Sequence, residues 1–262
     1  ITLSENQHKY ASEKVKKLAR ESIELRYRLL PYNYNLAFEN NQKGTPLMRP
    51  IFFEEDEEEL MTNASTYLWG KDFLITPILK DSISTKEVYF PKNTNWYNFY
   101  SDKKIKGGQT KIIKVEEHSI PTYVRAGAFI TMTKLVQTTD DYKGDNLEIH
   151  YFHDSLIEQS AREVYNDNGL LSSAFEKEQY EILKLEAKST KKGLKFNFNA
   201  SIGKKWNPKI KKIKLIIHNM NWQPNNIKVA GKKIKSFTNK NQITIPVLWN
   251  PKKKITIKLT HN

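Results

Sequence analysis

From Tyr67 onward the sequence is a series of short segments in which apolar and polar residues alternate, separated by residues that favour turns. A period of two places apolar side chains on one face of a strand, and many short strands at regular spacing are typical of a β-sandwich or barrel. The first part has five candidate strands: residues 73–79, 86–90, 96–99, 110–115 and 122–129. Turns are expected at residues 91–93, 106–108 and 126–127. The pattern therefore predicts a first antiparallel β-sandwich.

A polar segment over residues 137–145 (QTTDDYKGD) separates these strands from a second set. The second set comprises residues 147–152, 163–165, 181–187, 194–199, 210–218, 227–229, 242–247 and 254–259. We therefore expect a mainly β protein with two consecutive antiparallel β-sandwich domains, at residues 67–136 and 137–262.

The first 66 residues follow a different pattern. Apolar residues recur at spacings of three and four up to Leu36, which predicts a helix, and Pro31 should kink it or start a second one. Residues 45–53 favour a buried strand, and residues 54–64 favour a shorter helix. One strand between two helices cannot form a closed parallel sheet. We expect residues 1–66 to be an incomplete α/β unit and the chain to be a piece of something longer.

The positive charge belongs to the C-terminal part. Of the formal net charge of +14, residues 187–262 supply 19 lysines and no Arg, Asp or Glu, which leaves −5 for residues 1–186. Such a region could bind nucleic acid, or its lysines could simply cover solvent-facing strand positions. The second interpretation is favoured because Arg, which contacts phosphates and guanine through two parallel hydrogen bonds, is absent there.

Few residues suggest catalysis or metal binding. The absence of Cys excludes disulfides and thiolate metal sites, and no nucleotide-binding or nucleophile-elbow motif occurs. No segment has the roughly 20 apolar residues of a membrane-spanning helix. Residues 54–59 (EEDEEE) favour a solvated helix start over a carboxylate site, and residues 166–169 (NDNG) favour a hairpin turn over a calcium loop. His150 and His153 would point to opposite faces of a strand, so we interpret them as surface or turn residues.

The five tryptophans allow two interpretations. They are Trp69, Trp96, Trp206, Trp222 and Trp249. Exposed tryptophans in a β-sandwich could stack on sugar rings, whereas buried ones supply much of a small core. Core packing is the favoured interpretation for each.

Several stretches resemble glycoside hydrolase family 31, which includes α-glucosidases and α-xylosidases. Residues 21–32 (ESIELRYRLLPY) and 44–53 (GTPLMRPIFF) are similar to the end of the family's catalytic (β/α)8 barrel. Residues 70–79, 86–91, 96–99, 107–110 and 120–130 are similar to its proximal C-terminal β-domain. Residues 164–169 (VYNDNG), followed by Phe175 and Glu176, are similar to its distal one.

The resemblance implies that residues 1–66 are the C-terminal end of a (β/α)8 barrel, present as a helix–strand–helix remnant, followed by the two β-domains. The family's two catalytic aspartates lie N-terminal to the matched segment, so no catalytic residue is assigned here. Arg49, on the proposed eighth barrel strand, is a candidate substrate contact, with a buried structural ion pair as the alternative. No metal site and no cofactor are expected.

The function implied is that of the C-terminal portion of a retaining α-glucosidase that hydrolyses terminal α-glucosidic bonds of oligosaccharides. Its partners would be the upstream catalytic barrel of the same polypeptide and, through the parent enzyme, an oligosaccharide. Neither nucleic acid nor a membrane span is expected, and the chain alone should be inactive. The alternatives are a stand-alone carbohydrate-binding or scaffold module and lysine-driven binding of nucleic acid.

Overall fold

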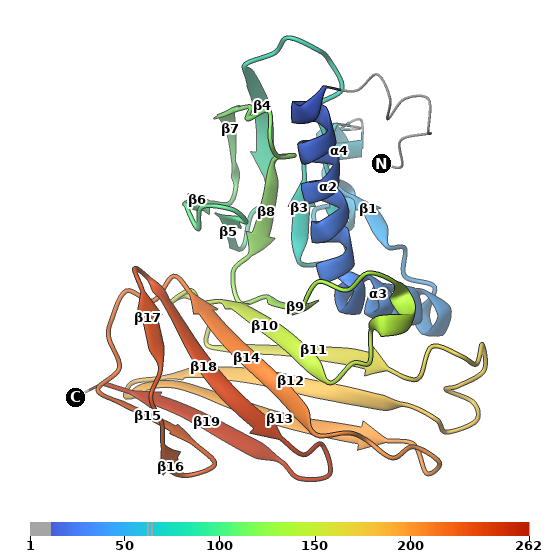
Figure 1. The fold of residues 1–262 in the computed structure, drawn as a ribbon. Helices are drawn as coiled ribbons and strands as arrows, with labels where there is room; N and C mark the ends of the chain where they lie inside the picture. Colours follow the sequence, from blue (N-terminus) through green and yellow to red (C-terminus); the bar gives the residue numbers. More distant parts are fainter. Residues whose placement is uncertain (1–11, 62, 64, 262) are drawn as a thin grey trace.

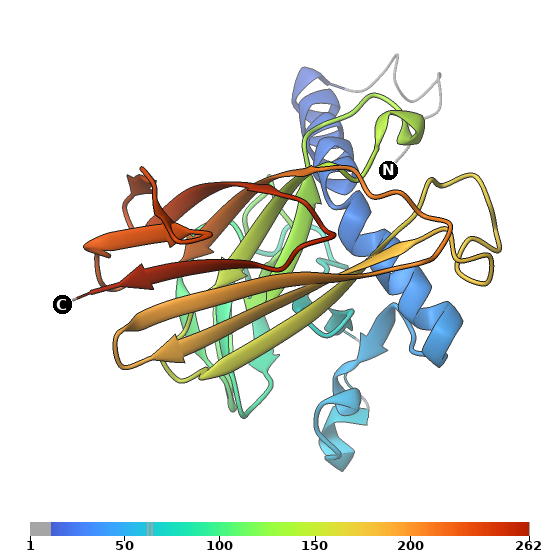
Figure 2. The ribbon, with the colours of Figure 1, turned by 90° about the horizontal axis from the view of Figure 1, so that it is seen from below.

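The computed structural model describes residues 12–61, 63 and 65–261. Along the chain, two helices come first, followed by two β-layered parts (Figure 1). Helices α2 (Glu13–Arg28) and α3 (Leu30–Lys43) run in succession along one side of the sheets (Figures 1 and 2). Pro31 stands in the first turn of α3, where its missing N–H costs no hydrogen bond, so the predicted start of a second helix is confirmed. Gly44 ends α3 with a φ of 65°, in the left-handed region that favours glycine.

The segment after α3 departs from its prediction. Residues 45–53 were expected to form a buried strand, but β1 (Met48–Pro50) is a three-residue edge strand and Met48 is 60% exposed. It is followed by the 3-10 turn η1 (Ile51–Phe53) and the single-turn helix α4 (Glu58–Met61). Prolines at residues 46 and 50 restrict the backbone on both sides and limit the length of the strand.

The proximal sheet has six strands in the order β1-β2-β3-β8-β5-β6, and a two-stranded antiparallel sheet, β4-β7, covers one of its faces. Its strands after β1 are β2 (Tyr67–Trp69), β3 (Phe73–Ile75), β5 (Asn95–Asn98), β6 (Lys104–Lys106) and β8 (Thr122–Arg125), and the covering two-stranded sheet consists of β4 (Thr85–Phe90) and β7 (Gln109–Lys114). The core between these layers contains Leu74, Phe90 and Trp96. The opposite face of the proximal sheet packs on Tyr32 and Leu36 of α3.

A second sandwich is formed by two larger sheets. The five-stranded sheet has the order β17-β18-β14-β10-β9, and the six-stranded distal sheet has the order β11-β12-β13-β19-β15-β16. Their strands are β9 (Phe129–Thr133), β10 (Asn146–Phe152), β11 (Gln159–Asn166), β12 (Glu181–Thr190), β13 (Gly193–Ile202), β14 (Lys211–His218), β15 (Asn226–Val229), β16 (Lys232–Lys233), β17 (Phe237–Asn239), β18 (Gln242–Trp249) and β19 (Ile255–Thr260). The predicted mainly β class with two β-layered parts is confirmed.

Two details of pairing differ from the expected simple antiparallel sandwiches. β10 and β14 pair in parallel, because the chain between them crosses to the other sheet through β11, β12 and β13. The expected single strand over residues 122–129 is broken at Gly127, whose φ is 76°. After this turn β9 leaves the proximal sheet and pairs with β10, so it joins the two parts of the molecule.

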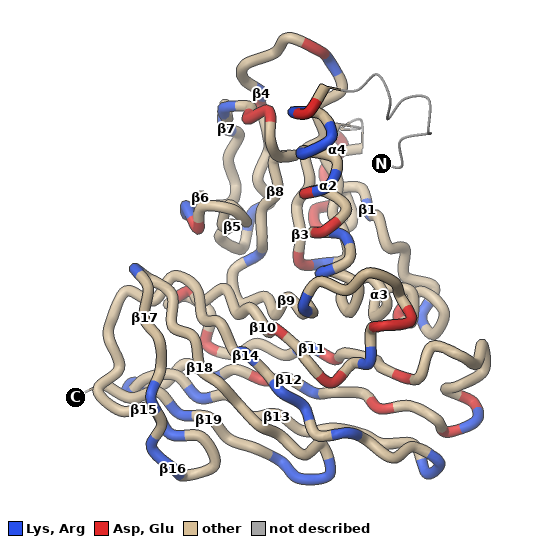
Figure 3. Tube along the Cα trace, in the orientation of Figure 1, with Lys and Arg blue, Asp and Glu red and all other residues tan. Residues whose placement is uncertain are grey.

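Charge is distributed as the composition suggests. Lys and Arg predominate over the strands after residue 187, whereas acidic residues are found near the helices and the first strands (Figure 3). In the part of the chain that the structure describes, no helix is both long and apolar enough to cross a membrane.

Candidate functional site

The candidate site is a cleft between α2, the proximal sheet and the exposed face of the five-stranded sheet. Its volume is about 600 Å³. It is lined by Glu21, Ser22, Leu25, Arg26, Arg28, Leu29, Tyr67, Trp69, Ile75, Phe99, Tyr100, His118, Ser119, Ile120, Thr122, Met132, His150 and His218. Because these residues come from the helix and from both β-layered parts, the tertiary fold creates the cleft.

A chain of hydrogen bonds runs behind one wall of the cleft. Nδ1 of His150 lies 2.9 Å from Nε2 of His218, and Nδ1 of His218 lies 2.9 Å from Oδ1 of Asp102. Gln242 donates to the other oxygen of Asp102 at 2.7 Å. Asp102 accepts, so His218 donates through Nδ1 and its Nε2 is left for the hydrogen bond with His150. Nε2 of His150 is a buried nitrogen without a hydrogen-bond partner among the described residues.

The protonation states follow from burial and from these contacts. Burial lowers the pKa of His150 to about 3, so its ring is neutral at ordinary pH. Burial alone would raise the pKa of Asp102, but the hydrogen bonds from His218 and Gln242 outweigh it and lower that pKa. Phe152 stacks on His218 with a centroid distance of 4.3 Å, which fixes the plane of the imidazole. The group is therefore a rigid polar contact between the β5–β6 connection and the five-stranded sheet.

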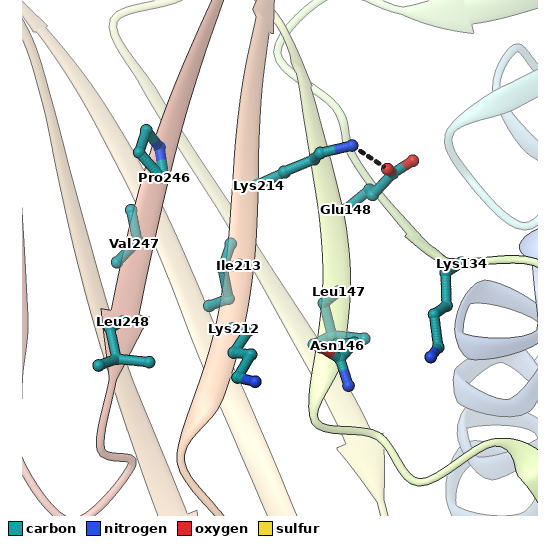
Figure 4. A pocket seen from close by; sticks show the side chains of 10 residues that line it. All are labelled: Lys134, Asn146, Leu147, Glu148, Lys212, Ile213, Lys214, Pro246, Val247 and Leu248. Atoms are coloured by element: carbon teal, nitrogen blue, oxygen red, sulfur yellow. Dashed lines mark hydrogen bonds and ion pairs between the residues drawn. The ribbon is translucent and has the colours of Figure 1, made fainter. Parts of the chain in front are cut away.

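Glu148 separates the cleft from a second hollow. Its carboxylate accepts from Arg28 of α2 at 2.6 Å and from Lys214 of β14 at 2.9 Å. The second hollow has a volume of about 510 Å³ and lies over β10, β14 and β18. Figure 4 shows the side chains that line it, with the contact between Glu148 and Lys214. The floor of this hollow is mostly apolar, and Glu148 is its only carboxylate. Both acceptor oxygens of that carboxylate are occupied, so it has a structural role as an ion-pair partner.

The structure corrects the interpretation of two histidines. His150 and His153 were expected at the surface or in turns, but His153 is 5% exposed and the His150 side chain is 13% exposed. Strand alternation does not decide how the two side chains face, because β10 ends at Phe152 and His153 follows the strand. It could not predict that His150 meets His218, 68 residues away, because β10 and β14 are brought together only by the sheet.

Four of the five tryptophans lie in or pack against a hydrophobic core, as the favoured interpretation expected. Trp96 and Trp249 are fully buried, as expected for core residues. Trp69, Trp206 and Trp222 are half-buried, and Trp69 is the one that lines the cleft. Its indole N–H donates to Asn33 of α3 at 3.1 Å, so the ring is held at the boundary between helix and sheet.

Arg49 is placed at the edge of the proximal sheet, outside the cleft. Its Nε donates to the carbonyl of Pro46 at 2.9 Å, and its guanidinium lies 3.9 Å from Glu39. These contacts match the alternative of a buried structural ion pair. A role in substrate binding stays a prediction.

The acidic run over residues 54–59 is only partly a solvated helix start. Glu55 is 5% exposed, and its carboxylate accepts from the Tyr89 hydroxyl at 2.7 Å and from the backbone N–H of Lys92. Glu54 pairs with Arg125 at 2.8 Å. These side chains tie the segment after β1 to the proximal sheet.

The NDNG segment starts at the last residue of β11 and opens the long connection over residues 167–180 to β12, so it is not the tight hairpin turn that was expected, although the two strands do pair. Asp167 accepts from the backbone N–H of Gly169 at 2.7 Å and from the hydroxyl of Tyr34 at 2.8 Å. Gly169 has a φ of 70°. The carboxylate therefore stabilises the turn and fastens it to α3.

Arg162 and Lys211 are among the buried charged groups that the sequence analysis missed. Arg162 of β11 lies 3.1 Å from Asp72 and over the ring of Tyr32, so it joins the distal sheet to the proximal sheet and α3. Lys211 is 1% exposed and donates to Glu181 and to the carbonyl of Gly144. In the sequence Lys211 resembles the solvent-facing lysines around it. The one available signal was its position, because alternation along β14 places residue 211 on the same face as the buried Ile213 and Leu215.

The cleft does not have the constellation that glycoside hydrolysis requires. Retaining glycosidases use two carboxyl groups about 5–5.5 Å apart. Among the residues that line the cleft, Glu21 is the only carboxylate. Within the described ranges, no group of three or more His, Cys, Asp or Glu side chains could hold a metal ion. The residues of the cleft serve to pack α2 against the sheets, and they leave aromatic side chains at its rim. They do not form a pair of carboxylates that could cleave a glycosidic bond.

Comparison with known proteins points to one family. Residues 44–130 match the model of the glycosyl hydrolase family 31 C-terminal domain. An alpha-xylosidase from Saccharolobus solfataricus is 32% identical over 185 residues, covering 70% of this chain and 24% of the relative. An alpha-glucosidase from the same organism is 34% identical over 161 residues, covering 60% of this chain and 22% of the relative. The chain thus spans about a quarter of the length of these relatives.

The fold has a close structural counterpart. A GH31 dextranase from Flavobacterium johnsoniae, solved in complex with glucose, aligns with 95% of this chain at a TM-score of 0.88 and 23% identity, and the match covers 33% of that chain. At this identity the likeness concerns the fold. It extends the match beyond residues 44–130 to the helices and to the second sandwich.

Proposed function

Since the chain corresponds to the C-terminal region of glycosyl hydrolase family 31 proteins, we propose that it is the C-terminal portion of a retaining glycoside hydrolase that cleaves terminal α-glucosidic bonds of oligosaccharides. The observation that carries the proposal is the match of residues 44–130 together with relatives named alpha-glucosidase and alpha-xylosidase. The preference for α-glucosides over α-xylosides is the more specific part of the proposal.

In this proposal the chain contributes accessory β-domains and the catalytic carboxylates belong to an upstream barrel of the same polypeptide. Tyr32 and Leu36 of α3 are buried against the proximal sheet, so the helices are firmly attached to the β-layered part. Val15 and Ile23 of α2 are 46% and 38% exposed and lie outside this contact. These side chains suit a face on which further barrel elements could pack.

The test compares the chain with a longer polypeptide that includes the upstream region. The purified chain should not release nitrophenol from p-nitrophenyl α-glucoside or α-xyloside, because its cleft lacks a pair of carboxylates. The longer polypeptide should hydrolyse one of the two, and the preferred substrate decides the specificity. Turnover by the short chain that survives repeated purification would contradict the proposed division of roles.

A second candidate is a stand-alone carbohydrate-binding or scaffold module. The aromatic edge of the cleft favours it, because Trp69 and Tyr100 line the cleft next to His118. Titration calorimetry with maltose and longer maltooligosaccharides checks this candidate. Heat that is lost in a Tyr100→Ala variant would support binding at the cleft, and the absence of heat at millimolar sugar would remove the candidate.

A further inference from the structure

The six-stranded distal sheet carries a row of cross-strand lysine pairs on the face away from its core. Cross-strand register places Lys188 opposite Lys195, Lys195 opposite Lys258, Lys258 opposite Lys228, and Lys228 opposite Lys233. Their neighbours along the strands, such as Phe196 and Ile257, are buried. Alternation therefore directs the lysines outward. Five neighbouring strands, β12, β13, β19, β15 and β16, each contribute one lysine to what we call the lysine row.

The lysine row carries no compensating acid. None of its five ammonium groups has an ion pair or a side-chain hydrogen bond in the described part of the chain, and the acidic residue nearest to it along these strands is Glu186, which is paired across strands with Asn197. Like charges directly opposite one another on neighbouring strands destabilise a sheet. Exposure to solvent alone does not explain why lysines on five strands lie directly opposite one another. The row is therefore a feature that a bound polyanion would stabilise.

A groove accompanies the row. It has a volume of about 500 Å³ and is lined by Lys195, Lys228, Lys254, Lys258 and the turn at Gly231. With neighbouring strands about 4.8 Å apart, the five ammonium groups span roughly 19 Å across the sheet. Figure 3 shows these lysine-bearing strands, β15, β16 and β19, on the side of the sandwich away from the helices. A linear ligand could lie along the row without approaching the candidate cleft.

We propose that the lysine row binds a linear acidic polysaccharide, such as a chain of uronic acid units. A series of single ammonium charges on successive strands, about 4.8 Å apart, matches a linear polymer with one carboxylate per unit. Single-stranded nucleic acid is disfavoured because its sites use aromatic platforms, and the row and its groove have none. A membrane surface is disfavoured because interfacial binding uses apolar side chains beside the basic ones. The proposal is independent of whether the parent enzyme is an α-glucosidase.

The experiment measures binding of the complete 262-residue chain to oligomers of alginate by fluorescence anisotropy at several salt concentrations. Binding should weaken as salt rises, since counterions are released on association. The triple variant Lys195→Gln/Lys228→Gln/Lys258→Gln should lose about tenfold or more in affinity at low salt. With three fewer ammonium groups, the protein neutralises fewer carboxylates of the polymer and fewer counterions are released on binding. The corresponding Lys→Arg triple variant keeps the charges and should retain binding.

The matched control is Lys103→Gln/Lys106→Gln/Lys111→Gln, which removes the same charge from exposed positions of the proximal part. It should change the affinity by less than about twofold. An equal loss in both triple variants would mean that net charge alone attracts the polymer, and this would overturn the proposal. Absence of alginate binding, or tighter binding of duplex DNA or of phosphatidylserine vesicles, would also overturn it. Circular dichroism of each variant verifies that the sheets are intact.

Discussion

His150 shows how one side chain makes the stability of this fold depend on pH. Its Nδ1 is hydrogen-bonded to His218 and its Nε2 has no hydrogen-bond partner in the described part of the chain, so the buried ring is accommodated as the neutral form. Burial lowers its pKa from 6.5 to about 3. The stabilisation is therefore fully present above about pH 6.5 and is lost progressively as the pH falls toward 3, because the unfolded chain binds the proton first.

We expect the free energy of unfolding to decrease by roughly 1.4 kcal/mol per pH unit below pH 6 from this group. Burial also lowers the pKa of His153, which adds to the slope in the same window. The pKa of Asp154 is lowered to about 2, so this carboxylate changes the pH dependence of stability only at lower pH, where it becomes protonated. Urea unfolding between pH 7 and 4.5 should show a smaller slope for His150→Gln than for the native sequence.

The control for this prediction is His118→Gln, since His118 is exposed. It should leave the slope unchanged. If His150→Gln and the native chain lose stability equally over this range, the ring is not the group that senses pH.

At the scale of elements, the β2–β3 connection and α3 are held in close contact at Gly70. Its φ is 63°, and a Cβ there would lie 2.5 Å from the Tyr32 hydroxyl and 2.7 Å from a methyl group of Leu36. The Tyr32 hydroxyl donates to the carbonyl of Trp69 at 2.7 Å. An added methyl group would therefore push the buried helix away from the proximal sheet.

Gly70→Ala should destabilise the protein by about 1–3 kcal/mol beyond the cost of the left-handed backbone. Gly169→Ala provides the matched comparison, because Gly169 has a φ of 70° and open space where its Cβ would lie. The difference between the two unfolding free energies isolates the steric part. Equal losses in the two variants would show that α3 can shift at no cost.

At the scale of the whole molecule, apolar side chains remain exposed around η1 and α4. Met48, Phe53 and Met61 are 53–60% exposed, in the segment that the resemblance assigns to the end of a barrel. Without covering elements such a patch favours self-association. Sedimentation velocity should therefore show the sedimentation coefficient of the chain rising with concentration.

Phe53→Ser/Met61→Ser should reduce this association. Leu156→Ser/Leu170→Ser changes two leucines that are equally or more exposed elsewhere, and it should have no effect. A native chain that stays monomeric at high concentration would contradict the idea that this surface needs a covering partner.

Local patterns in the sequence are enough to predict most elements of this protein. Alternation locates the strands, Pro31 separates the two helices, and Gly44 ends α3, since each depends on residues within one turn or one strand. The motifs around residues 44–53 and 120–130 are equally local, and they led to the correct family.

The tertiary structure alone decides which strands become neighbours. The parallel pair β10–β14, the contact of His150 with His218 and the alignment of Lys195 with Lys258 all join residues far apart in the chain. A one-residue change of register would move every one of these side chains to the opposite face, with little change in the local pattern. Pairing and register depend on how the sheets pack, and for this reason the cleft, its buried histidines and the lysine row could not be predicted from the sequence.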